Sequence, residues 1–330
     1  MQTVRTWGAP HPFHGARSAS ARKCVLAKAA KTTAAAPVIP AWPEFCRSAS
    51  GEWEGVSCTF NGSGEAQPLP SNYVPDAYRQ WGVELYDWQT VVSSRALPEQ
   101  PGQLELVCRR MMPTVGCEAD AVAFTEERSG GAASSNGAAA ATAAPALRLV
   151  VTEADGSYIA APASLPSEGN AAVEVCMVRG ASGEGKAQRV RVVHQLRRNW
   201  QSMEWMLAGV DVHNERCDGP YRGLVELCGC GGGMSPFGTT DRVAASQVEG
   251  SWRTVSSTGA GEPGSASAAG SEAVLLPLGL WMRSSVQGAE GEVAIEVGTL
   301  MPGGSQRKLA RVAFKSGQLA HSQMEVQDRS

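Results

Sequence analysis

The chain has 330 residues, of which 43% are apolar, so it can bury a sizeable core in one large or two medium domains. It has 29 basic and 32 acidic side chains, but residues 1–43 hold six basic residues and no Asp or Glu, leaving 23 basic against 32 acidic in residues 44–330. This acidic remainder argues against nucleic acid or an anionic membrane as the main partner, because both require a positive field.

Residues 1–43 are predicted to be a disordered chloroplast transit peptide and linker. The segment is rich in Ala, Ser and Thr, and its lack of acidic residues is typical of organelle-targeting peptides. It contains no apolar run of secretory length; a basic tail without a targeting role is the alternative. No later apolar run is long enough to span a bilayer. We therefore expect a soluble protein of the chloroplast stroma with no membrane span.

Residues 44–240 are predicted to form an antiparallel β-barrel. Runs such as VELYDWQTVV and RVRVVHQL alternate with period two, which is typical of strands. Short strands at regular spacing favour a barrel or sandwich. An Ala/Gly/Ser-rich segment at about 129–146 is predicted to be a disordered insert. The predicted strands are 53–60, 82–92, 104–110, 121–125, 147–153, 173–179, 189–196 and 206–213, with a helical turn at 73–80.

Residues 241–330 repeat this pattern with fewer strands. Gly51-Glu52-Trp53 opens the first region, and Gly250-Ser251-Trp252 opens the second. A second low-complexity insert is predicted at about 259–271. The predicted strands after Trp252 are 274–283, 292–300, 308–314 and 319–326. The sequence therefore predicts an all-β chain with a barrel followed by a second, smaller or incomplete barrel-like unit.

Two motifs that suggest chemistry are weak. GASGEGKA, residues 180–187, matches the core of a phosphate-binding loop, but Ala187 replaces the Ser or Thr that binds Mg²⁺ and a strand pattern follows instead of a helix. We interpret it as a hairpin turn. Cys217, Cys228 and Cys230 lack the paired ligand spacing of a zinc site, so no metal is predicted. Most cysteines are expected to be buried free thiols in a reducing compartment.

Aromatic and cationic residues supply the candidate site. Tyr86 and Trp88 lie on one face of a predicted strand, and Arg109 lies on the next; the rings would contact a ligand and the arginine would pair with a carboxylate. Trp53 and Trp252 are predicted to close the ends of the two barrel units, each beneath a stacked cation. Ordinary core or rim positions are the alternative for these tryptophans. The candidate cations are Arg189 or Arg191 in the first unit and Arg311 in the second.

Several segments resemble a lipocalin-like family of the calycin superfamily that occurs in plant and algal chloroplasts and in cyanobacteria. They are EFCRSASGEWEG, VPDAYRQWGVELYDWQT, MPTVGCEADA, RVRVVHQL and CDGPYRG. The resemblance implies a lipocalin-like barrel and a plastid location, and it supplies no catalytic residue set. Related calycins carry or attach pigments, so the resemblance makes a tetrapyrrole or a carotenoid the candidate cofactor.

The first functional hypothesis is a binding protein for a small apolar ligand: a pigment, tetrapyrrole or lipid. An eight-stranded barrel has room inside for one such molecule. The first alternative is a calycin-type isomerase or chromophore lyase that uses Glu118 or Asp120 as acid or base. The second alternative is a non-catalytic assembly or scaffold protein that binds a protein partner in the plastid through an exposed strand edge.

Overall fold

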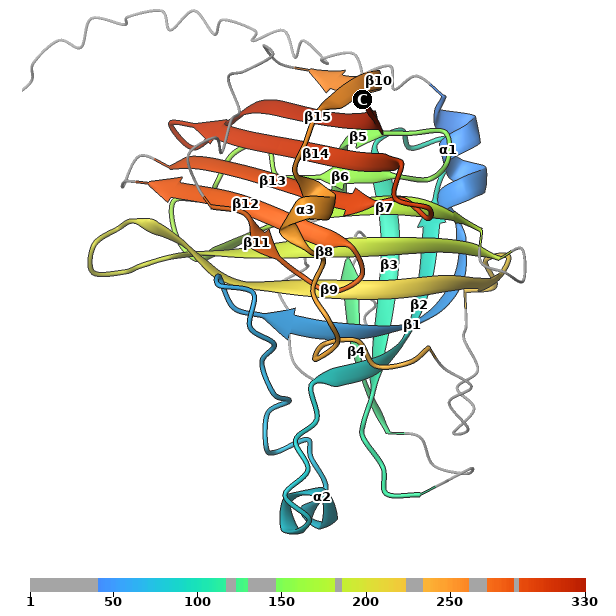
Figure 1. The fold of residues 1–330 in the computed structure, drawn as a ribbon, viewed down its shortest axis with the longest axis vertical. Helices are drawn as coiled ribbons and strands as arrows, with labels where there is room; N and C mark the ends of the chain where they lie inside the picture. The colour runs from blue at the N-terminus through green and yellow to red at the C-terminus, as the bar shows by residue number, and fades with distance from the viewer. Residues whose placement is uncertain are drawn as a thin grey trace, which may run out of the picture. The chain divides into compact units, whose positions relative to one another are not determined.

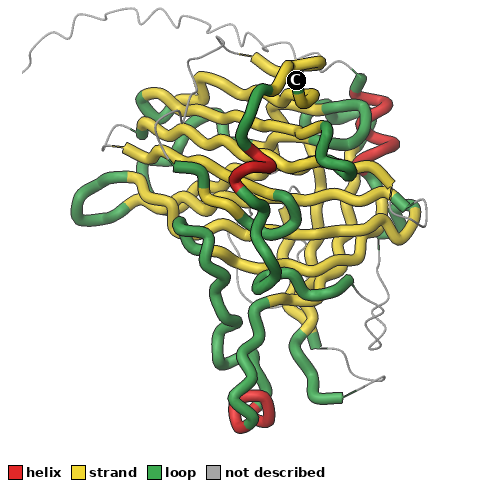
Figure 2. The backbone as a smooth tube through the Cα atoms, in the orientation of Figure 1, coloured by secondary structure: helices red, strands yellow, loops and turns green. Residues whose placement is uncertain are grey.

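The computed structural model describes residues 41–116, 123–129, 147–181, 186–223, 234–260, 272–287 and 291–330. Within these ranges the chain is mostly β-structure, as the alternating pattern predicts, and it forms two antiparallel sheets (Figure 1, Figure 2). The segment before residue 41 and most of both predicted inserts lie outside the described residues. None of the helices in these ranges has the length and apolar content needed to cross a bilayer.

The first sheet contains nine strands among the described residues. They are β1 (Gly51–Phe60), β2 (Asp87–Ala96), β3 (Gln103–Met111), β4 (Phe124–Ser129), β5 (Leu147–Thr152), β6 (Tyr158–Ala160), β7 (Asn170–Ala181), β8 (Ala187–Arg198) and β9 (Trp205–Gly219). The helices are α1 (Trp42–Ala49), α2 (Asp76–Gln80) and α3 (Ala245–Val248).

This sheet curls into a nearly closed ring. Its strands pair in the order β2-β1-β9-β8-β7-β6-β5-β3, and β2 also pairs with β3. The ladder between β3 and β5 involves only Gln103 and Leu104 of β3; from Leu106 onward, the neighbour of β3 is β4. The ring is barrel-like, as expected. Because side chains alternate across each strand, every second residue faces its interior.

Large side chains and α1 close one end of the ring. Trp53 and Tyr158 are fully buried there with Phe45 of α1, whose ring meets that of Tyr158 edge to face at 6.2 Å. The buried face of α1 has the i, i+3, i+4, i+7 spacing of an amphipathic helix. The sequence analysis missed this helix and placed the linker up to residue 43. Two helical turns give a weak pattern, and packing on the ring stabilises them.

The second sheet repeats part of the ring. Its strands are β10 (Trp252–Ala260), β11 (Val274–Leu275), β12 (Leu280–Gln287), β13 (Glu292–Leu300), β14 (Gln306–Lys315) and β15 (Gln318–Arg329). They pair in the order β10-β15-β14-β13-β12-β11, which is the order β1-β9-β8-β7-β6-β5 strand for strand. The described part of this sheet thus lacks counterparts of β2, β3 and β4. The shared order explains why the Gly-x-Trp step occurs twice, at the start of β1 and of β10.

The two sheets pack face to face. Outward residues of the ring, such as Val175, Val192 and Val212, join Ile295 and Val312 of the second sheet in one buried cluster. Leu165 N also donates to Gly317 O at 2.7 Å, tying the ring to the turn between β14 and β15. The apolar faces of the two sheets therefore pack against each other and form one buried layer. The opposite face of the first sheet lines the inside of the ring.

Three strand predictions need correction. The strand predicted at 82–92 begins at Asp87. Before it, Val83 N donates to Tyr78 O and Leu85 O accepts from Leu69 N, so these residues bond within the β1–β2 connection and not to a neighbouring strand. The run 274–283 is two strands, because Leu278 and Gly279 both adopt positive φ, near 62° and 70°, and reverse the chain. The strand predicted at 121–125 begins at Phe124 and extends to Ser129 in its described part.

His194 makes the stability of the protein sensitive to acid. It is fully buried, both ring nitrogens lack a hydrogen-bond partner, and it lies on the outward face of β8 opposite Val173 and Val210. Burial lowers the pKa of His194 from 6.5 to about 4. Below pH 6.5 the unfolded chain therefore binds a proton that the folded chain does not, and stability falls as the pH falls toward 4.

Between pH 7 and pH 4.5 we expect the free energy of unfolding to fall by about 2 to 3 kcal/mol less in His194→Leu than in the wild type. Urea unfolding of both proteins at the two pH values measures this difference. Equal losses in the wild type and the variant would show that His194 does not carry a depressed pKa.

Candidate ligand cavity

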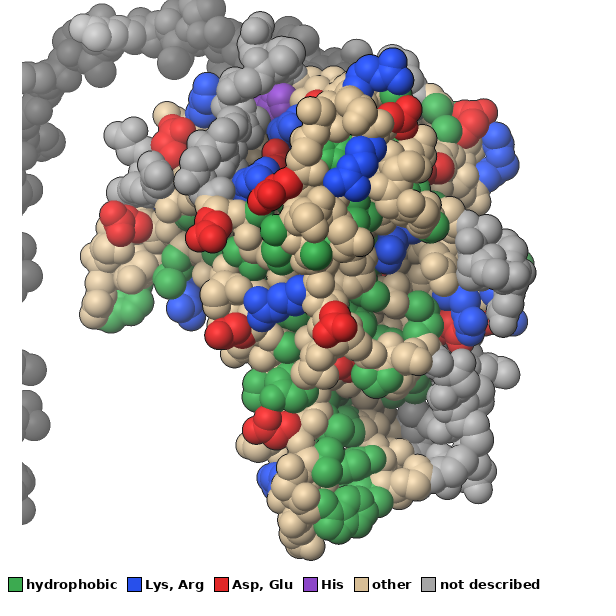
Figure 3. All heavy atoms as spheres, viewed as in Figure 1, with side chains coloured by type: hydrophobic (Ala, Val, Ile, Leu, Met, Phe, Trp, Pro, Cys, Tyr) green, Lys and Arg blue, Asp and Glu red, His purple; other side chains and the backbone are tan. Residues whose placement is uncertain are grey.

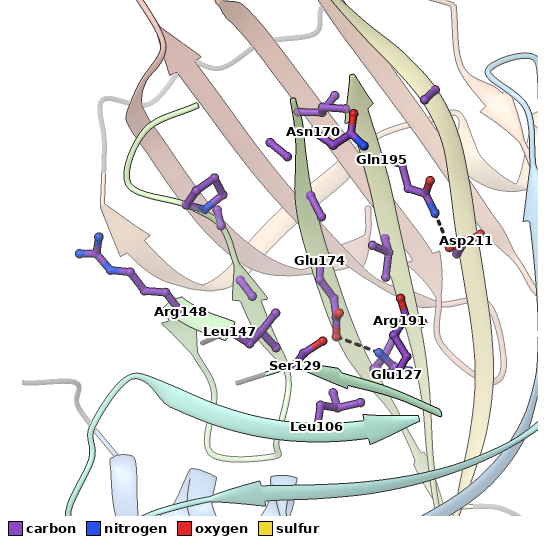
Figure 4. Close-up of a pocket in the computed structure, with 18 of the residues that line it drawn as sticks. Leu106, Glu127, Ser129, Leu147, Arg148, Asn170, Glu174, Arg191, Gln195 and Asp211 are labelled. Carbon is purple, nitrogen blue, oxygen red and sulfur yellow. Dashed lines mark hydrogen bonds and ion pairs between the residues drawn. The ribbon is translucent and has the colours of Figure 1, made fainter. Parts of the chain in front are cut away.

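The interior of the ring holds a cavity of about 980 Å³ (Figure 4). Inward side chains of β3, β4, β7, β8 and β9 line it, because alternate residues of each strand face the same side. Its apolar lining includes Leu106, Cys108, Leu147, Ala172, Val193 and Ala208. Its polar lining includes Arg110, Glu174, Arg191, Gln195, Asp211 and His213. The cavity thus combines apolar walls with a charged group of side chains.

A buried ion network forms the inner boundary of the cavity. Arg191 lies between two carboxylates, with Nη1 at 3.0 Å from Glu174 and Nη2 at 2.8 Å from Glu215. Arg189 Nε lies 2.6 Å from Glu215. Burial alone would raise the pKa of Glu215, but the two guanidinium groups outweigh it and hold that pKa well below its usual range. Glu215 is therefore ionised at neutral pH, and the network joins β7, β8 and β9.

Trp53 covers the end of this network. The Arg189 guanidinium lies 3.7 Å from the centre of the Trp53 ring, and the indole Nε1 donates to Ser94 Oγ at 3.1 Å. Both stacked side chains are at most 2% exposed. The sequence analysis named Arg189 or Arg191 as the cation stacked on Trp53, and in the structure it is Arg189.

Arg110 and His213 line the cavity, and each has a buried nitrogen without a hydrogen-bond partner. Arg110 Nε is buried without a hydrogen-bond partner, and its Nη2 lies 3.4 Å from Glu127 and 3.8 Å from Asp211, too far for strong hydrogen bonds. His213 Nδ1 is also buried and unpartnered. Burial, followed by the charge of Arg191, lowers the pKa of His213 well below 6.5, so its ring is neutral at pH 7.

Asp211 is better satisfied than Arg110. One carboxylate oxygen accepts from Thr59 Oγ1 at 2.6 Å. The other accepts from Gln195 Nε2 at 2.6 Å (Figure 4). The side chain of Glu127, the other acidic neighbour of Arg110, is 66% exposed. Arg110 therefore keeps donor capacity that a ligand oxyanion could use.

The residues predicted to contact a ligand lie elsewhere. Tyr86, Trp88 and Arg109 are not among the described residues that line the cavity. Tyr86 donates its hydroxyl to Glu84 at 2.6 Å, and Trp88 meets the ring of Tyr73 edge to face at 5.3 Å.

Arg109 is on the outward face of β3. Its Nε lies 2.7 Å from Glu126, and its guanidinium lies 4.8 Å from the Phe124 ring. Inward residues of β3 are even-numbered, so the adjacent Arg110 faces the cavity instead. The alternation of residues predicted the period of β3 but not which of its faces points inward.

The second sheet has its own tryptophan and cation pair. Arg307 lies 4.3 Å from the Trp252 ring centre. Arg311, the predicted partner of Trp252, is four residues farther along β14 and pairs instead with Glu296 at 2.9 Å and Glu325 at 2.8 Å. The predicted stacking of Arg311 is therefore corrected to Arg307, because register along β14 decides which side chain reaches the ring.

The alternative acid/base residues and two of the three cysteines considered for a metal site lie outside the described residues. Glu118 and Asp120 lie outside them, as do Cys228 and Cys230. The described ranges hold no group of three His, Cys, Asp or Glu side chains suited to a metal ion. Their cysteines are free, and Cys46, Cys58, Cys108 and Cys176 are buried as expected. β7 and β8 pair as far as Ala181 and Ala187, and residues 182–185 of the predicted turn at GASGEGKA lie outside the described residues.

Comparisons with known proteins leave the function open. No protein-family model matches the chain, and no curated protein matches it. Among solved structures, the chain is similar to a DUF3598 family protein of unknown function from Nostoc punctiforme. The TM-score is 0.48 and the sequence identity is 16%, over 88% of this chain and 98% of that chain. A likeness this distant supports no conclusion about function, so function must be argued from the cavity.

Proposed function

We propose that this protein binds one small amphiphile with a carboxylate group inside the ring. The observation that carries the proposal is Arg110, a cavity-lining cation whose carboxylate contacts are long, at 3.4 Å to Glu127 and 3.8 Å to Asp211. A wholly apolar guest would displace water from this cation and provide no hydrogen bond in return. A fatty acid or a tetrapyrrole with carboxylate side chains therefore fits better than a hydrocarbon carotenoid.

Arg110 is the cation in the cavity that is best placed to bind an anionic group. Arg191 is paired with Glu174 and Glu215. The side chain of Arg148 points away from the cavity (Figure 4). A ligand carboxylate would therefore be bound by Arg110 and not by a general positive field.

The proposed setting is a lipocalin-like barrel in the chloroplast stroma. The nearly closed ring with a cavity inside supports a lipocalin-like mode of binding. The basic, acid-free composition of residues 1–43 supports the plastid location. The lipocalin-like mode of binding and the plastid location are parts of the proposal that can be tested independently of the ligand.

Binding of cis-parinaric acid and of its methyl ester, followed by fluorescence, tests the carboxylate. We expect Arg110→Gln to weaken binding of the acid about tenfold, because a charged hydrogen bond contributes about 1.5–3 kcal/mol, and to leave binding of the ester unchanged. Arg109→Gln is the matched control: the same substitution one residue away, on the outward face of β3, should change neither affinity.

Val193→Trp separates the cavity from its charge. Val193 lines the cavity between Arg191 and Gln195 on β8, so an indole at this position should fill the space and abolish binding of both probes. If the wild type binds neither probe, or if Val193→Trp binds both, the cavity is not the ligand site. If acid and ester bind equally and Arg110→Gln has no effect, only the carboxylate assignment fails.

A further inference from the structure

Large exposed apolar side chains gather at the end of the ring opposite Trp53. Among the described residues, eight of the ten most exposed lie in connections or strand ends there: Tyr73, Trp81, Val83, Val115, Phe124, Trp200, Met203 and Met206. The pairings Cys58 with Asp87, Met111 with Phe124, and Arg198 with Trp205 place these segments at one end of their strands. Only Tyr221 and Val255 lie elsewhere. Trp200, Met203 and Met206 belong to the separate β8–β9 turn, whereas the other five lie in or beside the β1–β2 and β3–β4 connections. This larger group is the candidate interaction surface.

The segment around α2 forms the most prominent part of this surface. We call Tyr73, Tyr78, Trp81, Val83 and Val115 the apolar tip. Figure 1 shows α2 at the far end of a loop that projects beyond β1 and β2, and Figure 3 shows apolar side chains gathered there. Trp81 is 62% exposed. A convex tip offers no groove for a peptide or a helix.

Hydrogen bonds hold the apolar tip in shape. The ring of Tyr78 meets that of Trp81 edge to face at 5.9 Å, and its hydroxyl donates to Thr114 O at 3.0 Å. Val83 N donates to Tyr78 O at 2.9 Å. The β1–β2 and β3–β4 connections are thereby joined, so exposure of Trp81 is a fixed feature of the surface. Thr114 follows the cavity-lining Arg110 by four residues, so the tip is attached to the end of β3 that carries Arg110.

The charges of the tip indicate the kind of surface that it fits. Arg79 forms an ion pair with Asp76 on α2, and residues 61–86 contain no lysine. Counting Glu65 and Glu84, this connection is acidic, so anionic lipid and nucleic acid are unfavourable partners. Trp and Tyr are the residues that favour the interface of a bilayer, where an apolar ring can be buried while a polar group stays hydrated.

We propose that the apolar tip docks on an uncharged lipid bilayer, with Trp81 inserted at the headgroup level and the open end of the ring toward the lipid. This position would let an amphiphile pass between the bilayer and the cavity. The docking itself does not rest on the proposed ligand and can be tested with the empty protein.

Flotation with phosphatidylcholine vesicles tests the docking. We expect the wild-type protein to float with the vesicles and Trp81→Ser to partition about tenfold more weakly, because burial of the indole is lost. Trp200→Ser is the matched control: Trp200 is 80% exposed, in the separate β8–β9 turn, and its loss should change partitioning less than twofold. Unchanged circular dichroism and urea midpoints would show that both variants are folded.

Four outcomes would overturn the proposal. The wild type could fail to float, whether or not a protein partner binds at the tip. Trp81→Ser could float like the wild type. Trp200→Ser could lose as much binding as Trp81→Ser, which would remove the assignment to the tip. Binding restricted to vesicles of anionic lipid and released by salt would indicate electrostatic adsorption instead.

Discussion

Glu215→Gln is expected to destabilise the protein by about 3–5 kcal/mol, the usual cost of removing one partner from a buried ion pair. Glu215 is fully buried and is the carboxylate that Arg189 and Arg191 share. The amide would keep a hydrogen-bond acceptor but leave two buried guanidinium groups with Glu174 as their remaining carboxylate. The urea midpoint at pH 7 measures the loss.

Glu54→Gln is the matched control for this prediction. Glu54 accepts from Arg216 Nε at 2.9 Å, on the outward face of neighbouring strands, and both side chains are about one-quarter exposed. Water screens that pair, so its loss should cost about 0–1 kcal/mol. If the two variants are equally stable, the inner network is not held by its charges and the account of the ring interior is wrong.

The strand alternation that predicted the fold also held information about the cavity. In RVRVVHQL the residues Arg189 and Arg191 are two apart, and in DVHNER the residues Asp211, His213 and Glu215 follow the same period. Two strands that each carry a polar stripe indicate a polar ring interior. The hypothesis of a small apolar ligand inside the barrel implied an apolar interior instead.

The second sheet explains why that expectation was reversed. Val190, Val192 and Val212 supply the apolar stripe of the same strands, and this stripe packs against β12–β15. The sequence showed a second β unit but could not show that its apolar side lies against the outer face of the ring. Long-range packing therefore decided which face of β8 and β9 points inward. On β3, Leu104, Leu106 and Cys108 pack in the cluster of Trp53, which places Arg110 on the same inner face and Arg109 on the outer one.

Closure of the ring was predictable in part from Trp53. The Gly-x-Trp step marked the start of the first strand, and period two allowed a late arginine to stack on it; the geometry places Arg189 there. The corresponding prediction that Arg311 stacks on Trp252 was wrong. The guanidinium that lies over the Trp252 ring is that of Arg307, four residues before Arg311. Trp252 lies opposite Arg329 of β15, whereas Arg307 lies opposite Gln327 and Arg311 opposite Gln323, so Arg307 is nearer to the ring along the strand. A strand pattern does not reveal this register.

Trp53→Ala is expected to destabilise the protein by about 3–5 kcal/mol, the range for removing a buried tryptophan. The loss has two physical parts: a cavity between α1 and the ring, and exposure of Arg189, whose Nη1 and Nη2 have no hydrogen-bond partner and lie against the indole. Trp53→Phe should lose less, because an aromatic face remains for the guanidinium.

Trp200→Ala provides the baseline for this prediction, because an exposed tryptophan away from the core should cost less than about 0.5 kcal/mol. Urea unfolding of the three variants measures the order. A loss for Trp53→Ala that matches Trp200→Ala would show that the end of the ring is closed without its tryptophan. A loss for Trp53→Phe equal to that for Trp53→Ala would assign the effect to shape and to the Ser94 hydrogen bond, and would remove the role given to the stacked Arg189.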